Sequence, residues 1–127
     1  MAIGYANTLV TAQSDGAALA NTTTATSILP SAARLTLPGN YLSWIGQMLT
    51  VEAAGRISTV VTTPGTMTFS FVIGGITVAS SPAFALNIVA KTNVTWRLKW
   101  DFTVRAVGNG TAANLMHTGE WMSEAVI

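Results

Sequence analysis

The stretch Thr95–Ile127, TWRLKWDFTVRAVGNGTAANLMHTGEWMSEAVI, determines how the chain folds. Its first half alternates almost strictly between apolar and polar residues. The apolar positions are Trp96, Leu98, Trp100, Phe102, Val104 and Ala106, and the polar ones are Arg97, Lys99, Asp101, Thr103 and Arg105. Successive side chains of a strand point to opposite faces of a sheet, so this pattern predicts a strand with one apolar and one polar face.

The dipeptide Asn109-Gly110 predicts that this strand turns back as a hairpin, because both central residues of a type I′ turn need positive φ. A two-residue loop there sets four pairs opposite one another: Trp100 and Gly119, Leu98 and Trp121, Val104 and Leu115, Lys99 and Glu120. A slip of one residue would bury Glu120 and Glu124 without partners. In the favoured register Arg97 lies diagonal to both carboxylates. Exposed cross-strand pairs of this kind contribute about 0.2 to 1 kcal/mol each, so we expect them to set register and solubility.

The composition excludes several classes of function. Charged residues make up 9% of the 127 residues, where an ordinary soluble domain has about 25%. The net charge is +1, without the basic excess that a nucleic-acid-binding module needs, so we expect no direct nucleic-acid partner. Few charges and 50% hydrophobic residues leave a free monomer poorly protected against association. We therefore predict a homo-oligomer whose surface is largely covered by protein.

No membrane span, secretory signal or disulfide is expected. The sequence has no apolar run of the roughly 18 to 20 residues that cross a bilayer. Its opening, MAIGYANTLVTAQSDG, lacks a basic segment followed by a continuous apolar one. Cysteine is absent, which excludes thiolate metal sites and leaves stability to packing and assembly.

The rest of the chain favours an all-β fold. Threonine, valine, isoleucine and aromatic residues dominate over helix formers, as is typical of half-buried sheets. Pro64-Gly65 marks a turn, and Gly74-Gly75 predicts a second hairpin, in which Met67, Phe69, Phe71 and Ile73 share one face. Short strands with such spacing indicate an antiparallel β-sandwich or barrel. We predict a sandwich over residues 32–127 and an N-terminal arm, or first strands, over residues 1–31 that contacts neighbouring subunits.

The sequence presents no constellation of catalytic residues, so we expect neither an enzyme nor a cofactor or metal site. His117 falls on the apolar face opposite Phe102, with no second histidine, cysteine or carboxylate on that face. We interpret it as a partly buried, hydrogen-bonded side chain packed on aromatic rings rather than a general base or ligand. Glu120 and Glu124 are four residues apart, but the nearby cations compensate them, unlike a glycosidase pair with one raised pKa.

The four tryptophans favour core packing over ligand binding. Trp96, Trp100 and Trp121 share the inward face of the last hairpin, where large rings normally fill the core. Trp44 lies beside a turn and is the strongest candidate for an exposed contact. A binder of single-stranded nucleic acid needs rings and cations on the same side, whereas in WRLKW they alternate between faces.

The segments ANTTTATSILP, LTLPGNYL, GRISTVVTTPGTMTFSFVIGG and AKTNVTWRLKWDFTVRAVGNGTAANLMHTGEW together resemble small minor capsid and head decoration proteins of tailed bacteriophages. The resemblance covers nearly the whole chain and rests on turns and strands, without a catalytic signature. It implies a jelly-roll-like β-sandwich, to which the composition of the first 31 residues adds the extended N-terminal arm. It also implies a virion protein that binds the major capsid protein on the outer capsid surface, often as a homotrimer, and stabilises the head.

The resemblance transfers no site residues, so the expected contacts come from the pattern of the chain itself. We predict six interface residues: Tyr5, Leu9, Leu19, Ile28, Tyr41 and Trp44. Two alternatives remain open. One is a tail, baseplate or fibre component built from the same sandwich, and the other is a carbohydrate-binding module for attachment to a host surface.

Overall fold

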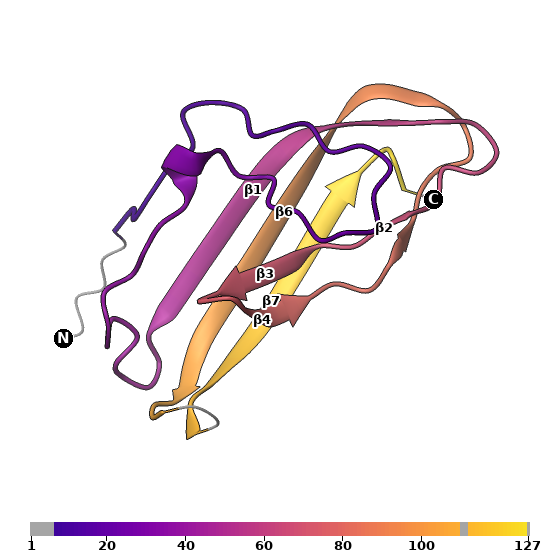
Figure 1. Ribbon diagram of the computed structural model, residues 1–127. Helices are drawn as coiled ribbons and strands as arrows, with labels where there is room; N and C mark the ends of the chain where they lie inside the picture. Colours follow the sequence, from indigo (N-terminus) through magenta and orange to yellow (C-terminus); the bar gives the residue numbers. More distant parts are fainter. Residues whose placement is uncertain (1–6, 110–111, 127) are drawn as a thin grey trace. The chain divides into compact units, whose positions relative to one another are not determined.

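The computed structural model describes residues 7–109 and 112–126 (Figure 1). The chain forms two compact units, Met1–Tyr41 and Leu42–Ile127. The first unit contains one short 3₁₀ helix, η1 (Ser31–Ala33), and no strand among its described residues. Most of its side chains are exposed, and its alanine, serine, threonine and asparagine residues lack the apolar alternation of a strand. The contact of an arm over residues 1–31 with a neighbouring subunit stays a prediction.

The second unit holds all the described strands. They are β1 (Met48–Thr59), β2 (Thr66–Met67), β3 (Ser70–Ile73), β4 (Ile76–Ser80), β5 (Phe84–Ala85), β6 (Lys91–Ala106) and β7 (Asn114–Ser123). One sheet has the order β1-β6-β7, and two smaller sheets pair β2 with β5 and β3 with β4. All these pairs are antiparallel.

This architecture confirms the predicted all-β, antiparallel, sandwich-like fold. The sheets hold three, two and two of the described strands. Residues 7–41 contribute no strand to them. Their side chains instead form short local hydrogen bonds, such as the one that Thr24 N donates to Thr22 Oγ1 at 3.1 Å.

The last hairpin has the predicted register. Trp100 lies opposite Gly119, Leu98 opposite Trp121, Val104 opposite Leu115 and Lys99 opposite Glu120. The pairing shifts between Val104 and Ala106, which pairs with Asn114, so the loop is longer than two residues. Gly110, the second residue of the predicted turn, lies outside the described residues. The Gly74-Gly75 hairpin is confirmed, with φ values of 59° and 80° that suit a type I′ turn.

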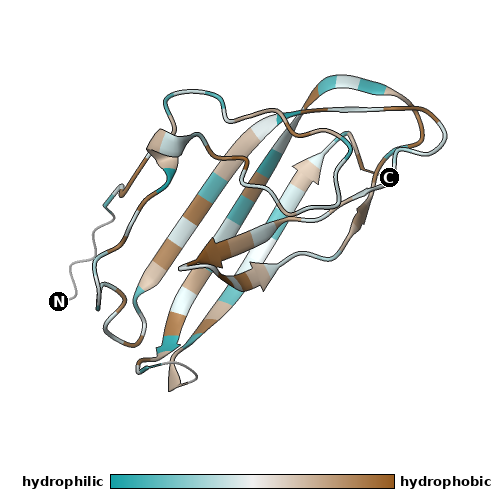
Figure 2. Cartoon of the chain, viewed as in Figure 1, coloured by the Kyte–Doolittle hydropathy of each residue, from teal (hydrophilic) through white to brown (hydrophobic). Residues whose placement is uncertain are grey.

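The core of the second unit is aromatic and joins the sheets face to face. Phe102 is 1% exposed and Trp100 is 4% exposed, both on the inner face of β6. Phe69 and Phe71 come from the β3 side, and Phe71 lies 4.7 Å from Phe102 between ring centroids. Alternating apolar and polar bands run along the long strands (Figure 2). The period-two pattern therefore builds the core directly.

Two tryptophan rings of β6 lie over glycines of the neighbouring strands. Trp96 faces Gly55 on β1, and Trp100 faces Gly119 on β7. A Cβ atom on Gly55 would lie 2.7 Å from the Trp96 ring, and one on Gly119 would lie 2.7 Å from the Trp100 ring. Real Cβ contacts do not reach this distance, so each glycine supplies the room that a ring occupies.

Replacing Gly119 by alanine is expected to lower the free energy of unfolding by about 1 to 3 kcal/mol, because the added methyl group overpacks against Trp100. Urea unfolding followed by tryptophan fluorescence measures the change. Gly39→Ala is the matched control, since no atom lies within 4 Å of the position that its added methyl group would take. Its effect should stay within about 0.5 kcal/mol. Equal stability of Gly119→Ala and wild type would contradict the packing argument.

Candidate functional site

The outer face of the β1-β6-β7 sheet gathers most of the chain's charge. In the central row Glu52 of β1, Lys99 of β6 and Glu120 of β7 lie side by side in register. Neighbouring strands are about 4.8 Å apart, which places the single cation between two carboxylates that are about 10 Å apart. The polar residues that alternate along the three strands therefore produce a surface with charges of both signs.

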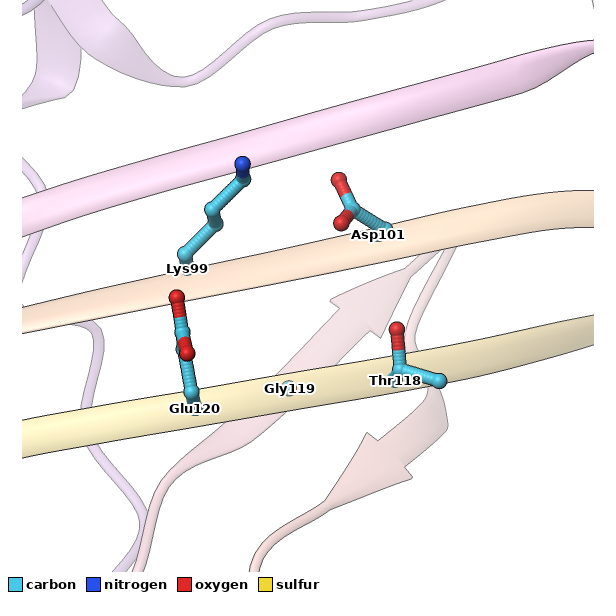
Figure 3. A pocket seen from close by; sticks show the side chains of 5 residues that line it. All are labelled: Lys99, Asp101, Thr118, Gly119 and Glu120. Atoms are coloured by element: carbon cyan, nitrogen blue, oxygen red, sulfur yellow. The ribbon is translucent and has the colours of Figure 1, made fainter.

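A shallow hollow of about 220 Å³ lies on this face, lined by Lys99, Asp101, Thr118, Gly119 and Glu120 (Figure 3). Thr50 Oγ1 of β1 donates a hydrogen bond of 3.0 Å to Asp101 Oδ1. Gly119 contributes only backbone atoms to this lining, because the position that its side chain would take lies on the inner face of the sheet, against the Trp100 ring. Charges of both signs on an open surface suit recognition of a polar protein surface.

The expected partners on this face are in register, but within the described part of the chain Lys99 and Glu120 form no ion pair. Lys99 faces Glu120 in register, but its ammonium group extends toward β1 (Figure 3). Glu124 does not lie on the strand, because β7 ends at Ser123 and Glu124 falls in the following turn. Ser123 ends the strand by accepting a hydrogen bond from Ala125 N at 3.1 Å. The predicted placement of two glutamates on one strand face is therefore wrong.

His117 packs on aromatic rings as predicted. Trp100 Nε1 donates a hydrogen bond of 3.2 Å to its Nδ1, and its ring centroid lies 6.0 Å from those of Trp100 and Phe102. The side chain is exposed rather than partly buried, because β7 is an edge strand of its sheet. An accepting Nδ1 assigns the proton of the neutral ring to Nε2.

A second groove, of about 190 Å³, runs between β7 and the connection from β4 to β5. Its lining includes the aromatic side chains of Phe84, Trp100, His117 and Trp121, with Ser81 on the other side. The Nε1 atom of Trp121 is buried and has no hydrogen-bond acceptor among the described residues. No pattern in the sequence signals this groove, since the groove depends on where the β4–β5 connection passes β7.

The predicted interface residues are distributed over both units. Trp44 is 60% exposed and Leu19 is 51% exposed, whereas Leu9 and Tyr41 are half-buried. Ile28 is 37% exposed. Tyr5 lies outside the described residues. The exposure of Trp44 agrees with its expected accessibility, while the role of all six residues in an interface stays a prediction.

Within residues 7–109 and 112–126, no three histidine, cysteine, aspartate or glutamate side chains form a group that could hold a metal ion. In the same part of the chain, no helix is both long enough and apolar enough to pass through a membrane.

Lys99→Glu is expected to destabilise the fold by roughly 0.5 to 1 kcal/mol, because it places three carboxylates in one cross-strand row. Urea unfolding at low and high salt measures this effect, which should shrink at high salt as the charges are screened. Lys99→Met is the control, since it keeps the length of the side chain and removes only the charge. A loss of stability in Lys99→Glu that salt does not reduce would argue against the electrostatic cause.

Comparison of the chain with protein-family models, with curated proteins and with solved structures found no match.

Proposed function

We propose that this protein is a structural component of a virion, a capsid decoration protein of a tailed bacteriophage that binds the head as an oligomer. One observation carries the proposal: among residues 7–109 and 112–126, 17 large hydrophobic side chains are 37% to 68% exposed. Isolated exposed apolar residues are common, but this number in a chain with 9% charged residues indicates surface that other proteins cover.

The surface near the start of β1 supports attachment to a protein partner. Trp44, Ile45 and Met48 are each at least 60% exposed, and they follow one another closely along the chain. Tryptophan and methionine are enriched in protein interfaces, and tryptophan is the residue most often found at energetic hot spots. We call these three residues the Trp44 cluster and assign it to contact with the capsid lattice.

Repetition on a lattice makes weak individual contacts sufficient. An oligomer that binds several equivalent sites gains affinity through effective concentration, without any stronger contact per copy. The resemblance to small virion proteins indicates the major capsid protein as the partner and the outer capsid surface as the location. A tail or baseplate position remains the structural alternative, which the location of the protein in a virion map would distinguish.

Trp44→Ala is expected to weaken binding to capsid shells by about 30-fold, the effect of losing a hot-spot side chain worth about 2 kcal/mol. The probe is a shell preparation of the virus that encodes this chain, purified without the protein, and co-sedimentation measures the binding. Trp44→Phe should retain most of the affinity. Because the side chain is 60% exposed, thermal stability should not change. Shells that fail to bind the wild-type protein would refute the proposal.

A carbohydrate-binding module is the second candidate, and the groove along β7 is the observation that favours it. Its aromatic lining and the exposed imidazole of His117 offer both ring faces and a hydrogen-bonding group to a neutral sugar.

If this second function is correct, a glycan array probed with the wild-type protein will show binding that His117→Ala weakens at least tenfold. Trp44→Ala is the control for this experiment, because Trp44 is not part of the groove lining. The array would be negative for a protein that only decorates capsids.

A further inference from the structure

Two adjacent loops of the second unit expose four aliphatic side chains. Val60 is 64% exposed, Val61 is 60% exposed, Ile88 is 58% exposed and Val89 is 60% exposed. We call these four residues the aliphatic tip. They come from the connection that follows β1 and from the one that precedes β6, two segments far apart in the sequence.

Backbone hydrogen bonds hold the two loops side by side. Thr62 N donates to the carbonyl oxygen of Ile88 at 3.1 Å. Thr59 Oγ1 accepts a hydrogen bond of 3.1 Å from Lys91 N, and the same hydroxyl donates to the carbonyl oxygen of Val89 at 3.5 Å. The four exposed side chains therefore belong to one continuous, cross-linked surface.

The first loop contains a strained turn. Thr63 N donates to the carbonyl oxygen of Val61 at 2.8 Å, and the intervening Thr62 has a φ of 71°. This is a γ-turn with positive φ at a β-branched residue, a conformation that costs about 1 to 3 kcal/mol. Strain of this size at an exposed pair of valines suggests a role for the turn in contact with another molecule.

The charge pattern selects the kind of partner. The segments 57–66 and 84–90, which contain both loops, have no charged residue. Around a symmetry axis each residue approaches its own copies, so a charge there would meet an identical charge, whereas aliphatic groups pack together. A membrane-binding surface typically inserts aromatic or leucine side chains. The tip has only valine and isoleucine.

We propose that the aliphatic tip packs against the same tip of other copies of this chain, on the symmetry axis of a homo-oligomer. This inference rests on the self-association part of the proposed function and adds the surface that produces it. The Trp44 cluster then remains available for the capsid.

Ile88→Glu tests the inference, because it places like charges together at the axis. We expect sedimentation velocity to show an oligomer for the wild-type protein and a dissociation constant raised at least about 100-fold for Ile88→Glu. Ile76→Glu is the matched control, since Ile76 is also exposed, at 68%, but lies outside the tip. An Ile88→Glu protein with the wild-type mass, or a monomeric wild-type protein, would overturn the inference.

Single cysteines give a second measurement that does not disturb charge. The chain has no cysteine, so Val61→Cys introduces one thiol per copy. Under mild oxidation, Val61→Cys should form a disulfide-linked dimer, while Val72→Cys, exposed at 54%, should not. Equal cross-linking of the two variants, or none in Val61→Cys, would also overturn the inference, and this test decides the matter if Ile88→Glu fails to fold.

Two further readouts separate this inference from its alternatives. If the wild-type protein floats with neutral phosphatidylcholine vesicles and Ile88→Glu does not, the tip binds a membrane rather than a second copy. This result would overturn the inference. An oligomer that Ile88→Glu dissociates but that does not bind capsid shells would support the tip contact while refuting capsid decoration. A monomeric wild-type protein that binds shells would refute the tip contact while supporting capsid decoration.

Discussion

The close approach of tryptophan rings to glycines across the strands is the constraint on which the second unit depends. The Trp96 ring extends from β6 over Gly55 of β1, and the Trp100 ring extends over Gly119 of β7 on the other side. Each ring thus covers a gap that no other residue type would leave open, and the central strand is joined to both neighbours by packing as well as by hydrogen bonds. Phe69 of the opposing layer then contacts Trp96, with ring centroids 5.3 Å apart.

The same alternation decides how the surface is divided. With rings on the inner face of β6, the charged residues that alternate with them from Arg97 to Arg105 lie on the outer face, where Lys99 stands between Glu52 and Glu120. Because this face takes most of the 11 charged residues, the ends of the sandwich keep few. The exposed apolar residues Trp44, Val61 and Ile88 at these ends are therefore a consequence of the core pattern in a chain of low charge.

A protein with such a surface is suited to assembly. The mixed-charge sheet face can align a polar partner, whereas apolar residues at separate places can bind different partners at the same time. His117 belongs to the same packed hairpin, since its Nδ1 accepts a hydrogen bond from Trp100 Nε1. The proposed virion function needs many simultaneous contacts of moderate strength, which separate apolar surfaces on one small domain provide.

The all-β class, the faces of β6 and the pairing of Trp100 with Gly119 could all be predicted from the sequence, because period-two alternation and hairpin register are local properties. The local pattern gave a wrong prediction where a side chain ended a strand, because Ser123 ends β7 before Glu124. The sequence did not predict that Val61 and Ile88 belong to one exposed surface, or that the β4–β5 connection forms a groove with β7. These features depend on contacts between segments far apart in the chain, and no periodicity within one segment encodes them.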